Sequence, residues 1–272
     1  MTTVLYLLRD GSEESSERMK YSLRSLDEAF PDEDVGIAVS SVRRPPWLAP
    51  SVRFASVCDY GKPAGLGKHW SMLCKVNQAI RQLGLSERFL VSADDHVAPL
   101  RPSCALRDWP YFSRGERYSD FTKERKDDKC WKWRRSIKWT VERLEAAGCP
   151  HTELLFATHR NSWFDPRYLE DAERIFSPSE WFHTPDEGAA HGPDPQTVYA
   201  LLALKGGTVS EGQYMRVRDV KSGDANSFFR SFWTPPDPKP DAACRWGGSL
   251  ALGRDNVRLL QCLFRRPSRW EA

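Results

Sequence analysis

The sequence lacks the features that would hold the chain in a membrane or cross-link it by disulfides. Its seven cysteines are an odd number and are widely spread, with no Cys-x-x-Cys spacing, which argues against a disulfide framework and against a zinc site. No apolar run approaches the length of a membrane span. The apolar residues near the N-terminus follow no basic segment and are too few for a signal peptide or an anchor. These absences predict a protein of a reducing cytoplasm with no membrane partner.

The charge balance lacks the strong excess of one sign that marks proteins that coat nucleic acid. The 272 residues carry 40 Lys and Arg against 37 Asp and Glu, for a formal net charge of +3. A nucleic-acid partner is therefore permitted but not required. The length suffices for one large α/β domain with a full core, and we expect a single domain over residues 1–272.

The chain also lacks internal repeats and both common phosphate-binding motifs. A glycine-rich basic loop at residues 59–68 has neither the Gly-x-x-x-x-Gly-Lys-Ser/Thr order nor the Gly-x-Gly-x-x-Gly order. Two interpretations of this loop remain. It is either an ordinary surface loop or a flap whose Lys62 or Lys68 meets a diphosphate.

Tryptophan, by contrast, is abundant, with eleven residues, and many lie near basic side chains. Between residues 108 and 143, aromatic and basic residues alternate, a composition typical of surfaces that neutralise phosphates and stack on bases. A helix is expected over residues 130–147, and Trp131, Trp133, Arg134 and Arg135 are its candidate contacts of this kind. The alternative is an ordinary amphipathic helix with a solvated basic face.

Hydrophobic periodicity predicts an α/β protein. Strands are expected at residues 4–8, 35–39, 52–57, 89–91, 154–159 and 217–221, and helices at residues 13–30, 70–83, 130–147, 164–176, 196–204 and 256–264. The opening strand-helix-strand order favours a parallel arrangement of the first strands.

The most informative stretch is the end of the strand at residues 89–91. This apolar run leads into Asp94, Asp95 and His96, so carboxylate oxygens follow a strand where open α/β folds bind their ligands. The alternative is a turn that these aspartates merely cap. Arg9 and Asp10 follow the first expected strand in the same way.

Six short motifs, in order along the chain, resemble those of a glycosyltransferase family. They are Tyr-Ser-Leu-Arg-Ser-Leu at 21–26, Pro-Trp-Leu at 46–48, Phe-Leu-Val-Ser-Ala-Asp-Asp-His at 89–96, Phe-Ala-Thr-His at 156–159, Asp-Val-Lys at 219–221 and Phe-x-x-Pro-Ser-x-x-Glu at 264–271. The family consists of GT-A-fold proteins that are common in bacteriophage genomes and distantly similar to Stealth-type sugar-phosphate transferases. The sequence departs from the family in three places: Ala93 replaces the usual Asn or Asp, Arg160-Asn161 follows His159 in place of a proline, and residues 108–140 are unusually basic.

The resemblance implies a GT-A-like (Rossmann-like) α/β/α sandwich with a mostly parallel central sheet. Residues 1–100 would bind a nucleotide sugar and residues 101–272 an acceptor. The implied reaction is the metal-dependent transfer of a sugar from a UDP-sugar, with UDP-glucose expected, to the hydroxyl of 5-hydroxymethylcytosine in DNA. A phage protein would act in the host cytoplasm. The alternatives are a glycan or small-molecule acceptor and a non-catalytic nucleic-acid-binding protein on the same scaffold.

The resemblance also implies roles for particular residues. Asp95 and Asp94 would hold Mn²⁺ or Mg²⁺, whose charge neutralises a departing diphosphate. The donor would lie beside Arg9, Asp10, Lys75, Asn77 and Asp94, although Lys75 and Asn77 fall off the apolar stripe of their helix and can equally face water. The base that takes the acceptor proton would be Asp194, His159 or His191. The acceptor-binding residues would be Trp131, Trp133, Arg134 and Arg135.

Overall fold

The computed structural model describes residues 1–8, 12–57, 67–94, 96–98, 105–109, 112–113, 117–123, 131–153, 161–177, 191–209, 214–215 and 260–272. The elements in chain order are β1 (Thr2–Leu7), α1 (Glu13–Ala29), β2 (Val35–Ser41), β3 (Arg53–Ser56), α2 (Lys68–Leu83), β4 (Phe89–Ala93), η1 (Leu106–Asp108), β5 (Phe112–Ser113), α3 (Tyr118–Phe121), α4 (Trp131–Ala146), β6 (Ser162–Phe164), η2 (Pro166–Tyr168), α5 (Leu169–Ile175), α7 (Pro195–Lys205) and β7 (Tyr214–Met215). The expected strands at 154–159 and 217–221 lie outside the described residues, as does the first part of the expected helix at 256–264.

The central sheet has five strands in the order β3-β2-β1-β4-β6, and β5 and β7 form a separate small pair. The strands β3, β2, β1 and β4 run parallel, whereas β6 runs antiparallel to β4. The mostly parallel sheet that the sequence predicted is therefore confirmed. Because β6 comes from the second half of the chain, the sheet draws strands from both halves.

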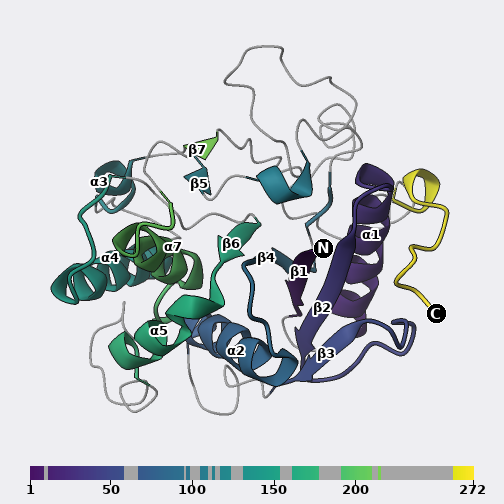
Figure 1. Ribbon diagram of the computed structural model, residues 1–272, viewed down its shortest axis with the longest axis horizontal. Helices are drawn as coiled ribbons and strands as arrows, with labels where there is room; N and C mark the ends of the chain where they lie inside the picture. Colours follow the sequence, from purple (N-terminus) through teal and green to yellow (C-terminus); the bar gives the residue numbers. More distant parts are fainter. Residues whose placement is uncertain are drawn as a thin grey trace.

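Alternate side chains of β1 enter two separate cores, as the pleat of a strand requires. Val4, Tyr6 and Leu8 pack with the buried face of α1, while Leu5 and Leu7 pack with residues of α2, α4 and α7. Figure 1 shows α1 on one side of the sheet and α2, α5 and α7 on the other. The expected three-layer α/β/α sandwich is present. None of the helices in the described ranges is long and apolar enough to cross a membrane.

The α1 helix follows directly from its sequence. Ser12 is its N-cap, and the Ser12 hydroxyl accepts a hydrogen bond from the Ser15 amide at 3.2 Å. Met19, Leu23 and Leu26 recur at helical spacing and are fully buried against the sheet. The expected helix and the observed one differ by a single residue at the C-terminal end.

One prediction is wrong at its boundary. A helix was expected from residue 164, but Ser162, Trp163 and Phe164 form the edge strand β6, and the helical turns η2 and α5 follow it. The side chains of Trp163 and Phe164 are both buried, one in each core. A strand of three residues that is buried on both faces has no alternation to distinguish it from the start of a helix.

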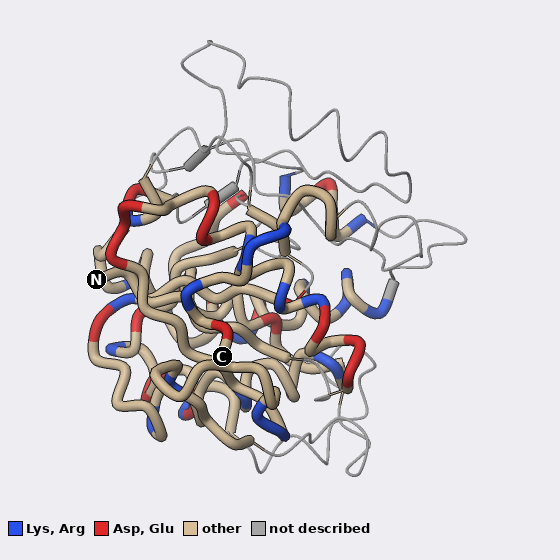
Figure 2. Tube along the Cα trace, turned by 90° about the vertical axis from the view of Figure 1, so that its right-hand side faces the viewer, with Lys and Arg blue, Asp and Glu red and all other residues tan. Residues whose placement is uncertain are grey.

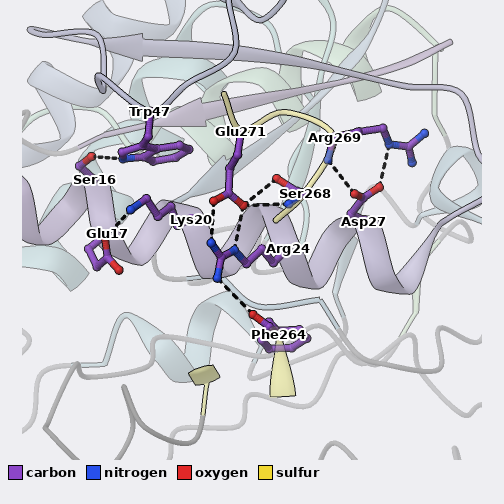
Figure 3. A network of polar contacts seen from close by, with 10 residues as sticks. All are labelled: Ser16, Glu17, Lys20, Arg24, Asp27, Trp47, Phe264, Ser268, Arg269 and Glu271. Carbon is purple, nitrogen blue, oxygen red and sulfur yellow. Dashed lines mark hydrogen bonds and ion pairs between the residues drawn. The ribbon is translucent and has the colours of Figure 1, made fainter. Parts of the chain in front are cut away.

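Residues 264–272 form a segment, here called the C-terminal clasp, that binds the outer side of α1 (Figure 3). The Arg24 guanidinium donates to both carboxylate oxygens of Glu271, at 2.8 and 2.7 Å, and to the Phe264 carbonyl at 3.2 Å. Glu271 also accepts from the Ser268 amide at 2.8 Å. Arg269 binds Asp27 on the next turn of α1, with an Nε to Oδ1 distance of 2.7 Å.

The clasp also binds the connector between β2 and β3. The Ala49 amide donates to the Trp270 carbonyl at 2.9 Å, and the Ala272 amide donates to the Trp47 carbonyl at 2.7 Å. The Trp270 side chain is buried in the same core as Leu48. The clasp therefore brings together three of the six sequence motifs, at 21–26, 46–48 and 264–271.

We predict that Glu271→Gln lowers the free energy of unfolding by about 2 kcal/mol, because it leaves a largely buried guanidinium without its opposite charge. Burial alone would raise the pKa of Glu271, but the hydrogen bonds from Arg24 and Ser268 outweigh it, and the pKa is lowered. This stabilisation is present above the pKa of an unfolded glutamate and is lost as the pH falls through the lowered value.

The difference between wild type and Glu271→Gln, measured by urea unfolding at several pH values, should therefore shrink toward zero in acid. Glu142→Gln is the matched control, because Glu142 meets Lys138 at 3.9 Å in an exposed pair. We expect that control to change stability by less than about 0.5 kcal/mol. An equal effect of both substitutions would contradict the role of the clasp.

Candidate functional site

The sheet has a topological switch point between β1 and β4. From β1 the chain moves outward to β2 and β3 and then returns to the other side of β1 as β4. Open α/β sheets bind ligands outside the carboxyl ends of the strands at such a point. Leu7 pairs with Ala93 across it, so Leu8 and Asp94 are the next residues at this edge. Arg9, Asp10 and Asp95 lie outside the described residues, and their roles stay predictions.

Two serines of α1 hold the turn that follows β4. Ser22 Oγ donates to the His96 carbonyl and lies 3.1 Å from the Tyr6 hydroxyl. Ser25 Oγ accepts from the Ala98 amide at 2.8 Å and donates to the Ser22 carbonyl at 2.7 Å. The backbone beside Asp94 is thus fixed against a helix.

The side chain of His96 also stabilises this turn. Its side chain is buried, and its Nδ1 lies 2.7 Å from Asn161 Oδ1 and 3.3 Å from the Ala93 amide. The Asn161 carbonyl accepts from Trp109 Nε1 at 3.1 Å. Asn161 was one of the departures from the family pattern, and its role as the partner of His96 was missed because nothing in the sequence links residues 65 positions apart.

Lys75 and Asn77, two expected donor-binding residues, are both buried in α2. The expectation that they lie off its buried stripe is wrong, because α2 packs against the sheet on one side and against α7 on another. Lys75 Nζ donates to the Leu8 carbonyl at 3.1 Å, which brings its charge to the end of β1. Asn77 Oδ1 accepts from the Tyr199 hydroxyl at 2.9 Å, so this amide joins α2 to α7.

The expected divalent ion is compatible with the chemistry of this edge. Asp94 is buried at the end of β4 and offers carboxylate oxygens, the ligands that Mg²⁺ and Mn²⁺ prefer. Within the described ranges, no group of three or more His, Cys, Asp or Glu residues could hold a metal ion. Asp95 lies outside these ranges. The metal therefore stays a prediction that depends on Asp94 and Asp95 together.

A second cluster of titratable groups, here called the imidazole cluster, consists of His69, His191 and Asp194. The rings of His69 and His191 meet edge-on with their centroids 4.4 Å apart. His69 Nε2 lies 3.9 Å from Asp194 Oδ1. The structure thus brings together two of the three expected bases, His191 and Asp194, while His159 lies outside the described residues.

His69 was missed by sequence reasoning, although a signal was available. It directly follows the glycine-rich loop at 59–68 and lies in the first turn of the helix that leads into β4. In a parallel sheet such a helix begins at the carboxyl edge of the strands. A polar residue in that first turn therefore lies on the ligand side of the fold.

Two hydroxyls of α4 hold the imidazole cluster. Ser136 Oγ lies 2.8 Å from His69 Nδ1 and donates to the Gly192 carbonyl. Thr140 Oγ1 accepts from the Asp194 amide at 3.1 Å. The first turns of α2 and α7 are thereby both tied to α4.

Asp194 is the N-cap of α7, and its Oδ2 accepts from both the amide and the hydroxyl of Thr197 at 2.8 Å. Burial raises the pKa of Asp194, and the Thr197 bonds and the charge of Lys68 oppose this only in part. His191 is half-buried, and burial, followed by the charges of Lys68 and Lys132, lowers its pKa. His191 is therefore a neutral imidazole at pH 7 that reaches solvent.

The expected acceptor residues on α4 fall into two groups. Trp133 and Arg134 both contact Phe121 of α3: the two rings lie 4.8 Å apart, and the guanidinium stacks 4.4 Å above the Phe121 ring and donates to its carbonyl. Arg135 is exposed on the other side of the helix. The side chain of Trp131, the first residue of α4, lies outside the description.

We predict that Gly192→Ala destabilises the protein by more than about 3 kcal/mol. Gly192 has φ +96°, and a Cβ there would collide with the backbone nitrogen of Trp70 in the first turn of α2. Gly207→Ala is the matched control, because Gly207 has φ +67° with nothing within 4 Å of the added carbon. Thermal unfolding should show a loss of about 1 kcal/mol for the control, from backbone strain alone. Equal losses would mean that Gly192 is not a close contact between α2 and α7.

No protein-family model and no curated protein matches the chain. Among solved structures, the chain is similar to the galactosyltransferase LgtC in complex with donor and acceptor sugar analogues. The TM-score is 0.52 and the identity 11% over 98% of both chains. A structure of an LgtC active-site mutant gives a TM-score of 0.47 and 11% identity over the same shares. The chain, with its mostly parallel five-stranded sheet between helices, thus has the GT-A fold of LgtC.

Proposed function

We propose that the chain is a glycosyltransferase that uses a nucleotide-sugar donor. The observation that carries this proposal is the position of Asp94 in a GT-A fold. It lies at the carboxyl end of β4, at the switch point beside β1, which is the ligand-binding edge of such sheets. Asp95 follows it in the sequence and is the second carboxylate of the proposed diphosphate site.

The donor in this proposal is a UDP-sugar, with UDP-glucose expected. Arg9, Asp10 and Lys75 bind it from the β1 side, and Asp94 binds it from the β4 side. A divalent ion, Mn²⁺ or Mg²⁺, held by Asp94 and Asp95 supplies positive charge that neutralises the departing diphosphate. Lys75 can contribute to the same neutralisation because its ammonium group is held at the end of β1 by the Leu8 carbonyl.

His191 is the base that takes the proton of the acceptor hydroxyl. Of the two expected bases within the described ranges, Asp194 is only 5% exposed and bonds to Thr197, whereas His191 is half-buried and reaches solvent. A neutral imidazole with a lowered pKa is competent to accept a proton at pH 7. His159, the third candidate, stays an alternative.

The acceptor that we propose is the hydroxyl of 5-hydroxymethylcytosine in DNA. Three basic side chains are exposed along α4, namely Lys132, Arg135 and Lys138. In addition to burial, the charge of Lys132, which lies in the first turn of α4, lowers the pKa of His191. Exposed cations three residues apart on one helix can neutralise successive phosphates. Figure 2 shows acidic and basic residues intermingled along the described chain. The support for a DNA acceptor is therefore this short row of exposed cations on α4.

A sugar acceptor is the second candidate, and one observation favours it. LgtC, the galactosyltransferase with the similar fold, was solved with an acceptor sugar analogue as well as with a donor analogue. A glycan would be held by hydrogen bonds to its hydroxyls and would depend little on the cations of α4.

We predict that the protein, incubated with UDP-glucose, Mn²⁺ and DNA containing 5-hydroxymethylcytosine, adds one hexose to each modified nucleoside. Digestion of the DNA and mass analysis of the nucleosides measures the product. DNA of the same sequence with unmodified cytosine is the control and should stay unchanged. If no common nucleotide sugar gives a glycosylated nucleoside, the DNA acceptor is excluded.

Salt separates the two acceptor candidates. Binding to DNA phosphates releases counterions, so KM for DNA should rise steeply between 50 and 200 mM salt, on the order of tenfold or more. The KM for a neutral glycan should barely respond over that range. A salt-independent KM would therefore favour the sugar acceptor.

We also predict that Asp94→Asn weakens UDP binding in the presence of Mn²⁺ by tenfold or more, about 1.4 kcal/mol, with little effect when the metal is withheld. Calorimetric titration with UDP measures this without any acceptor. Asp108→Asn is the control, because Asp108 is exposed and lies in η1 rather than at the end of a central strand. If neither the removal of Mn²⁺ nor Asp94→Asn changes the affinity for UDP, the result would contradict a donor site at this edge.

A further inference from the structure

The imidazole cluster lies where two helices carry cations at their N-terminal ends. Lys68 is the first residue of α2, and Lys132 is the second residue of α4. Neither helix has an acidic residue in its first turn, whereas α1 and α5 each have two there. A helix N-terminus already carries partial positive charge, so a lysine at that end adds to the charge instead of balancing it. A bound anion would stabilise this arrangement.

Hydrogen bonds place both helix ends beside His191. Ser136 lies four residues after Lys132 and therefore on the same face of α4. Its hydroxyl donates to the carbonyl of Gly192, the residue that follows His191. From the first turn of α2, the ring of His69 meets the His191 ring with the two centroids 4.4 Å apart. The first turns of α2 and α4 thus meet at this imidazole.

The charges at these helix ends act on the same imidazole. Burial, and then the charges of Lys68 from α2 and Lys132 from α4, lower the pKa of His191. The other titratable groups of the cluster are His69 from α2 and Asp194 at the start of α7. The carboxylate of Asp194 is buried as the N-cap of α7, whereas Lys68 is exposed and forms no ion pair within the described ranges. Lys68 is thus available to an anion from solution.

We propose that Lys68 and Lys132 bind one phosphate group of the acceptor beside His191, and that this phosphate makes the imidazole a stronger base. The role of this phosphate rests on the proposed function, in which His191 takes the acceptor proton. The acceptor then carries a phosphate close to its reactive hydroxyl, as a nucleotide of DNA does and a neutral glycan does not. Lys132 is also the first of the three exposed cations along α4, so the phosphate site leads into that row.

The base becomes stronger because an anion changes the charge that an imidazolium meets. Without the acceptor, burial and two ammonium groups oppose a proton on His191. A phosphate diester carries one negative charge, which offsets part of that repulsion and favours the imidazolium. During transfer the acceptor O–H bond breaks, its proton moves to His191, the oxygen bonds to the anomeric carbon and the nucleoside diphosphate leaves. His191 later releases its proton to water.

NMR titration of the His191 ring tests this coupling without donor or acceptor. Sulfate is the first probe because it does not titrate near pH 7, and sodium chloride of equal ionic strength is its control. We expect sulfate to raise the pKa of His191 by about half a pH unit more than chloride does. A short DNA duplex with unmodified cytosine should also raise it, at a far lower concentration, because several of its phosphates bind at once.

Lys68→Gln tests the site itself, because it removes the charge and keeps a side chain of similar length. The pKa of His191 should then be higher from the start and should respond to sulfate and DNA less than half as much. Lys132→Gln should act in the same direction. In both variants the affinity for unmodified DNA should fall severalfold, with a salt slope smaller by about one. Lys205→Gln is the matched control, because Lys205 lies at the opposite end of α7 from His191 and should change neither quantity.

An unchanged titration of His191 in saturating DNA would overturn the proposal, as would a full response to DNA in Lys68→Gln. Metal-free UDP separates the acceptor phosphate from the donor diphosphate. A response of His191 to UDP with none to DNA would assign the lysines to the donor and reject the acceptor phosphate. If no nucleotide sugar supports transfer to any acceptor, the proposed function fails, while the titration still decides whether the anion site is present.

Discussion

Two buried hydroxyls and one guanidinium on α1 hold the part of the protein on which the candidate donor site depends. Ser22 and Ser25 bind the backbone of the turn after β4, and Arg24, between them in sequence, binds Glu271 and the C-terminal clasp. Buried polar groups must keep their partners, so each contact restrains the helix against displacement. The turn that carries Asp94 and the end of the chain, more than 170 residues later, are therefore held by the same two turns of helix.

A second pair of buried hydroxyls holds backbone segments and helix ends in place on the other side of the sheet. Ser136 and Thr140 bind the first turn of α2 and the N-cap of α7, and Gly192 allows the two backbones to meet. The consequence is a fixed position for His191 relative to α2, the helix whose Lys75 reaches the end of β1. Donor edge and candidate base are thus connected through one helix, which is a more rigid link than a loop would provide.

Periodicity predicted the elements that carry long buried stripes, such as α1 and α2, together with the parallel sheet that follows from their order. Periodicity failed for residues that lie between more than two packed elements. Asn77 was expected off the buried stripe of α2 because a single apolar face was assumed, whereas α7 covers a second face through Tyr199. The strand β6 has only three residues and pairs with β4, far away in the chain, so it leaves no local sequence pattern. The contact between Arg24 and Glu271 leaves none either, because its two residues are far apart in the sequence. Asp94 and His191 could be proposed from sequence because their chemistry is visible without a partner, whereas His69 joins the imidazole cluster only through its contacts with Ser136 and Asp194.

The alternation of basic and aromatic residues before and within α4 includes side chains that the fold itself engages, and their acceptor role stays a prediction. Trp133 and Arg134 read as acceptor contacts in sequence, but both contact Phe121, and the Arg134 guanidinium donates to the backbone there. An arginine that stacks on a ring and donates to a carbonyl is stabilising the fold, and its charge reaches a phosphate only at the cost of those contacts. The cations with exposed side chains on this helix are Lys132, Arg135 and Lys138. A nucleic-acid acceptor would thus meet a narrow row of charge beside His191, which suits contact with a few phosphates around one extruded base better than a long electrostatic footprint.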